Sequence, residues 1–197
     1  MPWKKLITNE MILVLIDFQD GFAPLMKPKI YQAARANAII LLKMCKELSI
    51  PLVGTEHYRR GIGPTAPQLM EIWNLETDKM IEKITFSCWG TPAFANTLTD
   101  SKRKTVILIG IETHICVLQT ALDLLEQGFS VIVIADAVVS STKLKWQNGI
   151  DLMRTAGAHI LNTETLLFYI LKRADSKEFK YLVRLLKDAK STCEIGE

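Results

Sequence analysis

The sequence has no long apolar run, no long basic run and no closely spaced pair of cysteines. The apolar run at residues 11–16 is too short for a membrane span or for the core of a secretion signal. The net charge is only +3, and the basic residues are scattered, which gives nucleic acids and membranes little electrostatic attraction. We therefore expect no nucleic-acid or membrane partner and a cytoplasmic location, with an organellar one left open.

Cysteines are few, and none belongs to a C-x-x-C motif; they are Cys45, Cys88, Cys116 and Cys193. This number and spacing exclude a small disulfide-stabilised scaffold. We expect all four to be reduced thiols in an intracellular protein.

Neither repeats nor low-complexity linkers divide the chain, and 49% of its 197 residues are hydrophobic. That length is sufficient for one sizeable core and short for two. The sequence therefore predicts one domain over residues 1–197, with a helical extension from about residue 163.

Short apolar runs alternate with stretches of helical periodicity. Five runs are continuously apolar, as expected of parallel strands buried on both faces, and a sixth strand is expected near residues 80–84; the five are 11–16, 51–54, 105–110, 131–135 and 158–162. Helical spacing occurs over 30–48 and after Cys116, where Gly128 fits a helix end, and residues 175–178 resemble a capping box before a last helix. This alternation predicts a three-layer α/β/α sandwich around a doubly wound six-stranded parallel sheet.

Polar residues stand where two of these strands end. Asp17 follows the first strand directly, and Cys116 follows the 105–110 strand by six residues. Ligands of such sheets bind at the carboxyl ends of the strands, where the strand order reverses. If the order is 3-2-1-4-5-6, Asp17 and Cys116 face the same crevice.

Cys116 has two interpretations. A thiol in the first turn of a helix lies near the positive end of the helix dipole, which would lower its pKa, and Asp17 could accept its proton. From position alone a buried structural cysteine is the more frequent role, because free cysteine is among the most buried residue types. Lys83, at the end of the strand expected near residues 80–84, could stabilise both the Asp17 carboxylate and a Cys116 thiolate. By itself, a lysine at the end of a strand is usually a surface residue.

Three ordered motifs identify a resemblance: D-F-Q-D-x-F from Asp17, K-x-x-F-S-x-W-G-T from Lys83 and G-I-E-T-H-x-C-V-x-Q-T-A from Gly110. Together they resemble the isochorismatase-like cysteine hydrolase superfamily, whose relatives include nicotinamidases and N-carbamoylsarcosine amidase. The segment TEHYRRGIGPT is similar to one in the isochorismatase domain-containing branch.

The resemblance implies an isochorismatase-like fold and a metal-independent hydrolase of small amides that needs no cofactor. It implies Cys116 as nucleophile, Asp17 as general base and Lys83 as electrostatic support, acting through a thioester intermediate. It also implies a cis peptide at Ile111–Glu112 and an oxyanion hole formed by the backbone N–H groups of Glu112 and Cys116.

The sequence departs from some of these relatives. Nicotinamidases bind a metal through a D-x-H…H cluster, whereas this chain has Glu56-His57 and no second histidine nearby, so we expect no metal site and a pocket-edge or surface role for His57. Isochorismatase proper cleaves a vinyl ether without a cysteine nucleophile, so Cys116 favours amide hydrolysis. His114 points away from Cys116 if both are helical, which predicts a structural role for it.

Three aromatic residues follow strand ends or catalytic motifs and are candidate pocket walls, although each could belong to the core: Phe22, Tyr58 and Trp89. The alternative to a hydrolase is a scaffold protein that keeps the fold and binds a partner. A helical tail over residues 163–190 could serve that role, or an enzyme, by forming a homo-oligomer.

Overall fold

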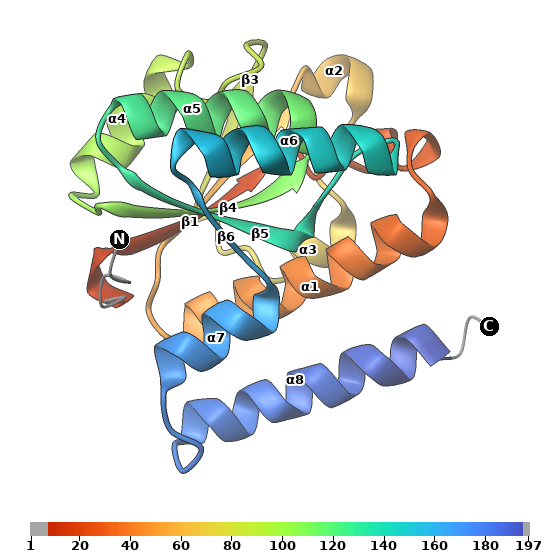
Figure 1. Ribbon diagram of the computed structural model, residues 1–197, viewed down its shortest axis with the longest axis vertical. Helices are drawn as coiled ribbons and strands as arrows, with labels where there is room; N and C mark the ends of the chain where they lie inside the picture. The colour runs from red at the N-terminus through yellow and green to blue at the C-terminus, as the bar shows by residue number, and fades with distance from the viewer. Residues whose placement is uncertain (1–7, 195–197) are drawn as a thin grey trace.

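Six parallel strands form one sheet in the computed structural model, which describes residues 8–194 and the side chains among them up to residue 189 (Figure 1). The sheet order is β3-β2-β1-β4-β5-β6. The strands are β1 Met11–Ile16, β2 Leu52–His57, β3 Lys79–Lys83, β4 Thr105–Ile111, β5 Ser130–Val139 and β6 His159–Leu161. This confirms the predicted order, and β1 and β4 lie side by side at its reversal.

Helices cover both faces of the sheet (Figure 1). One face carries α1 Pro28–Glu47, α3 Pro67–Met70 and α7 Thr163–Leu171, and the other carries α4 Pro92–Asp100, α5 Leu118–Glu126 and α6 Lys143–Ala156. Three short helical segments precede or follow strands: the 3₁₀ turns η1 Thr8–Glu10 and η2 Asp20–Leu25, and the single α-helical turn α2 Arg59–Ile62. A π-helical turn, η3 Thr113–Val117, leads from β4 into α5. The result is the predicted three-layer sandwich.

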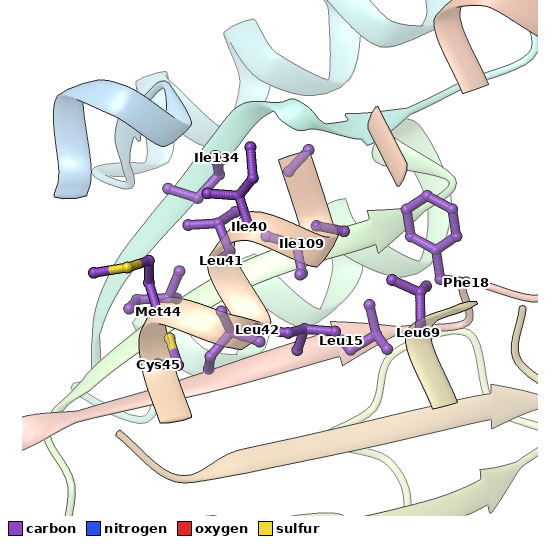
Figure 2. Packing of buried hydrophobic residues seen from close by; sticks show 14 of the residues in the cluster. Leu15, Phe18, Ile40, Leu41, Leu42, Met44, Cys45, Leu69, Ile109 and Ile134 are labelled. Atoms are coloured by element: carbon purple, nitrogen blue, oxygen red, sulfur yellow. The ribbon is translucent and has the colours of Figure 1, made fainter. Parts of the chain in front are cut away.

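Alternate residues of each central strand enter different halves of the core. Leu15 and Ile109 pack beneath α1, as Figure 2 shows, together with Leu41 of that helix. Ile16 and Leu108 face α5 on the other side. Period-two alternation within a wholly apolar run therefore fills both layers, because each strand is buried on both faces.

Two strands are longer than their apolar runs, since polar side chains within them find partners. Asp136 continues β5 because its Oδ1 accepts hydrogen bonds from the backbone N and the Oγ1 of Thr163, both at 2.9 Å. Glu56 continues β2 because its Oε1 accepts from the backbone N of Thr65 at 2.7 Å. Strand boundaries set by hydropathy alone stop short at such residues.

The helical tail consists of two helices, α7 and α8. After α7, Lys172 adopts a left-handed conformation with φ of 60°, and α8 runs over Lys177–Glu194. The predicted capping box is wrong by one residue: the backbone N of Phe179 donates to Ser176 Oγ at 3.1 Å. Leu182 of α8 is buried against the α1 layer, so this apolar face is used within the chain. None of the described helices is long and apolar enough to cross a membrane.

Gly110 sets how closely β1 and β4 approach at their carboxyl ends. It has φ of +132°, and a Cβ added there would lie 2.0 Å from the backbone oxygen of Ile16. The register of β4 against β5 shifts between Leu108 and Gly110, which marks a β-bulge. A glycine is therefore required one residue before the segment that leads to Cys116.

We predict that Gly110→Ala destabilises the protein much more than Gly128→Ala. Both glycines have positive φ, but a Cβ at Gly128 would meet open space. The backbone cost of about 1–2 kcal/mol should apply to both, and the clash with Ile16 should bring the Gly110→Ala loss above about 3 kcal/mol. Urea unfolding of both variants measures the difference, and equal losses would show that the close approach is unimportant.

Candidate active site

Asp17 lies buried at the end of β1. Its side chain is fully inaccessible, and its backbone has φ of 48°. Thr55 Oγ1 donates to Asp17 Oδ1 at 2.7 Å, and the backbone N of Asp17 donates to the backbone oxygen of Thr55 at 3.0 Å. The neighbouring strand β2 therefore fixes both the backbone and the side chain of this carboxylate.

Lys83, at the end of β3, forms a buried ion pair with Asp17. Its Nζ lies 2.6 Å from Asp17 Oδ2, and neither side chain is exposed. The Nζ also donates to the backbone oxygens of Thr85 at 3.0 Å and Phe86 at 3.1 Å. Burial is the largest single effect and opposes the charged ammonium, but the charge of Asp17, together with Cys88, Cys116 and the contact with Asp17, outweighs it and raises the pKa of Lys83. The interpretation of Lys83 as an ordinary surface lysine is therefore wrong.

Cys116 lies in η3, and its thiol meets the same ion pair. The residue is 5% exposed, and the preceding Ile111–Glu112 peptide is cis, as the resemblance implied. Burial raises the pKa of the Cys116 thiol, as do the charge of Asp17 and a hydrogen bond with it, while Lys83 lowers it. The expectation that the helix dipole gives a low pKa is wrong here, because desolvation is the largest effect.

A second thiol, which the sequence did not single out, reaches this cluster. Cys88 is wholly buried, and its Sγ lies 3.6 Å from Thr55 Oγ1. Its backbone N donates to Thr120 Oγ1 at 2.9 Å, which ties the segment after β3 to α5. Burial raises its pKa to about 11, with Asp17 raising and Lys83 lowering it. Cys45, by contrast, is buried in the core, and burial alone raises its pKa to about 12.

The turn before Cys116 is held by the loop after β5. Glu112 Oε2 accepts from the backbone N of Ser141 at 2.9 Å. His114 Nδ1 lies 3.0 Å from Ser140 Oγ and 3.8 Å from Glu112 Oε2. Burial lowers the pKa of His114. These contacts agree with a structural role for His114 rather than a Cys–His pair.

Gln19 joins β1, β2 and the loop around α2. Its Nε2 donates to the backbone oxygens of His57, at 3.1 Å, and of Gly63, and its Oε1 accepts from the backbone N of His57 at 2.7 Å. The His57 ring stacks on Phe86, with 5.5 Å between ring centroids. Burial, and next the charge of Lys83, lower the pKa of His57. His57 therefore lies at the edge of the cluster. The sequence analysis did not name Phe86 as a site residue, and only its position three residues after Lys83 could have suggested it.

Of the three predicted pocket walls, Tyr58 directly follows β2 and is joined to Lys83 through its backbone. It is largely exposed, and its backbone N donates to the backbone oxygen of Lys83 at 2.8 Å. Phe22 packs on the α1 face of the sheet, whereas Cys116 belongs to the α5 face. The Trp89 ring meets Phe129, before the amino end of β5, with 5.9 Å between centroids. These contacts give the Phe22 and Trp89 side chains neighbours in the core, and all three assignments as pocket walls stay predictions.

Metal ligands do not gather within residues 8–194: no three His, Cys, Asp or Glu side chains described there could hold one ion. Glu56, next to His57, instead contacts Thr65 and Arg59, and Nη1 of Arg59 lies 2.6 Å from Glu56 Oε2. The groups that converge are a carboxylate, an ammonium group and two thiols.

Comparisons with known proteins agree with this architecture. Isochorismatase domain-containing protein 2A from Mus musculus is 32% identical over 187 residues, which cover 93% of this chain and 86% of that protein. The structure of MAR1 ribonuclease from Caenorhabditis elegans superposes with a TM-score of 0.84 at 33% identity, covering 92% of this chain and 91% of that one. The YcaC gene product from Escherichia coli, 22% identical, shares the fold with a TM-score of 0.87 over 98% and 96% of the two chains. Residues 11–165 match the family described as Isochorismatase domain, and the chain therefore belongs to the isochorismatase family.

Proposed function

We propose that the protein is a cysteine hydrolase that cleaves the C–N bond of a small amide through a thioester on Cys116. The observation that carries the proposal is the buried Asp17 carboxylate, which pairs with the ammonium group of Lys83 at 2.6 Å and lies near enough to the thiol of Cys116 to raise its pKa. A base, a nucleophile and a fixed positive charge thereby share one buried cluster. Membership of a family with a hydrolase fold is consistent with this chemistry.

In the proposed reaction, Asp17 takes the proton of Cys116 as Sγ attacks the carbonyl carbon. The carbonyl oxygen becomes an oxyanion that accepts hydrogen bonds from the backbone N–H groups of Glu112 and Cys116. Asp17 then gives the proton to the leaving nitrogen, the C–N bond breaks, and a thioester remains. Water attacks the thioester with Asp17 as base, which releases a carboxylic acid and restores the thiol.

The raised pKa of Cys116 fits this sequence of steps. A thiol that is neutral at rest resists oxidation and loses its proton only when the adjacent carboxylate accepts it. Lys83 keeps a positive charge beside both groups, so the proton can move between them without leaving an unpaired anion in a buried site. The ion pair therefore supports the nucleophile without ionising it beforehand.

The surroundings favour a substrate with an apolar or planar body. Ile84 is 78% exposed, and Phe86 and Tyr58 are each 53% exposed, all within a few residues of Lys83 or His57. Large apolar side chains left in water beside a catalytic cluster are suited to contact a substrate. The amide group would enter toward Cys116 and its attached body would lie along these side chains.

A second candidate is RNA hydrolysis, which one comparison favours. The C. elegans protein of the same fold is described as a ribonuclease and is 33% identical to this chain. Against it, the basic residues of this sequence form no long run. RNA is therefore included in the activity test as a competing substrate.

We expect ammonia or amine release from a panel of small aliphatic and aromatic amides, with one or more members turned over. Cys116→Ala should reduce the rate by about a thousandfold or more, because the variant lacks the nucleophile. Cys45→Ala makes the same change at a buried thiol outside the cluster and should keep activity within about threefold. Mass spectrometry of rapidly quenched reactions should show an acyl adduct on Cys116.

Amide hydrolysis that survives Cys116→Ala would contradict the proposal. RNA cleavage by the wild type, with no amide turned over, would favour the second candidate. Absence of both activities would favour the binding or scaffold alternative.

We predict opposite shifts in the ionisation of Cys116 when its two charged neighbours are removed. Lys83→Met removes a group that lowers the pKa of the thiol and should raise it further. Asp17→Asn removes a group that raises this pKa and should lower it, so that more thiolate is present at neutral pH. Thiolate absorbance, measured as the difference from Cys116→Ala, gives each titration. Shifts of the Cys116 pKa in the same direction in both variants would contradict the placement of Cys116 beside one positive and one negative group.

A further inference from the structure

The hydroxyl of Thr55 lies between the Asp17 carboxylate and the Cys88 thiol. Thr55 Oγ1 is 2.7 Å from Asp17 Oδ1 and 3.6 Å from Cys88 Sγ. Thr55 is 1% exposed, and Asp17 and Cys88 are fully buried. The proposed reaction assigns no role to Thr55 or Cys88.

The chemistry of the three groups fixes the direction of both contacts. An ionised carboxylate only accepts hydrogen bonds, so the single hydroxyl hydrogen of Thr55 is directed to Asp17. The oxygen of Thr55 then has only lone pairs to offer Cys88, so the S–H group of Cys88 donates to Thr55. The resulting order is Cys88 to Thr55 to Asp17, with each group donating to the next.

We propose that Thr55 is a positioning residue for the reaction; this inference rests on the proposed function. Thr55 donates a hydrogen bond to Oδ1 of Asp17, and Lys83 forms an ion pair with Oδ2, so each carboxylate oxygen has a different partner. Two partners on different oxygens fix the plane of the carboxylate, and with it the orientation of the carboxylate relative to the thiol of Cys116. A hydrogen bond to a carboxylate also stabilises its charged form.

Four titratable groups face Asp17 from the surrounding elements, and the effect of Thr55 has to be separated from theirs. They are Lys83 of β3, Cys88 after β3, Cys116 of η3 and His57 of β2. Thr55 does not titrate, so its removal changes the hydrogen bond without changing any charge. The isosteric variant Thr55→Val therefore isolates the hydroxyl.

The test measures the alkylation rate of Cys116 by iodoacetamide from acidic to alkaline pH, with mass spectrometry of the Cys116 peptide to separate it from the other thiols. In the wild type, the rate should fall from neutral toward acidic pH. Thr55→Val removes a hydrogen-bond donor from the carboxylate of Asp17 and should move this acidic limb upward by about one pH unit. Thr55→Ser, which restores the donor, should return the limb to the wild-type position.

Cys88→Ala is the matched control, because it changes the other contact of the Thr55 hydroxyl. It removes the donor to Thr55 but leaves the Thr55 hydroxyl on Asp17, so the limb should move by less than about 0.3 units. Should Thr55→Val not fold, as judged by circular dichroism and urea unfolding, Thr55→Ala removes the same hydroxyl without adding volume and should give the same upward shift.

The Asp17→Asn variant separates failure of this inference from failure of the proposed function. Loss of the acidic limb in Asp17→Asn, with Thr55→Val indistinguishable from the wild type, would overturn the role of Thr55 and keep Asp17 as the base. The Cys116 thiol of Asp17→Asn still titrates, so a limb that coincides with the thiolate absorbance of this variant is expected. A limb that stays at the wild-type position, apart from that titration, would overturn Asp17 as the base and the Thr55 inference with it. An upward shift in Thr55→Val that Thr55→Ser does not reverse would make the role of Thr55 merely structural.

Discussion

A carboxylate and an ammonium group, both removed from water, hold the carboxyl edge of the sheet together: Lys83 Nζ lies 2.6 Å from Asp17 Oδ2. Taking either charge out of water costs several kcal/mol, which only the partner and further hydrogen bonds offset. Asp17 ends β1 and Lys83 ends β3, with β2 between them. The ion pair therefore forms only if β1, β2 and β3 end at the same level of the sheet. The rest of the site depends on that alignment.

The residues around this ion pair each position a different segment of the site. Thr55 of β2 occupies the second oxygen of Asp17, and Gln19 ties β2 to the loop around α2. Gly110 lets β4 come close enough to β1 for the following turn to present Cys116 to the carboxylate. Because each contact comes from a different element, the site is rigid only as part of the complete fold.

Sequence reasoning found the groups of the site but not their electrostatics. Asp17 and Cys116 were identifiable because each follows an apolar strand, and Lys83 because of the motif that begins with it. The helix-dipole argument for Cys116 considered one local field, whereas burial and Asp17 determine its pKa. Thr55 and Cys88 gave no signal, since a threonine in a strand and a lone cysteine are ordinary residues until the strands are placed side by side.

The sequence by itself determined the layered fold, because apolar runs buried on both faces and the helices between them leave few other packings. It also determined where the candidate catalytic groups lie relative to the strand ends. Only the tertiary structure decided that Trp89 contacts Phe129, and that burial and the charge of Asp17 raise the pKa of the Cys116 thiol. Both outcomes depend on distances between segments far apart in the chain, and local periodicity carries no information about those distances.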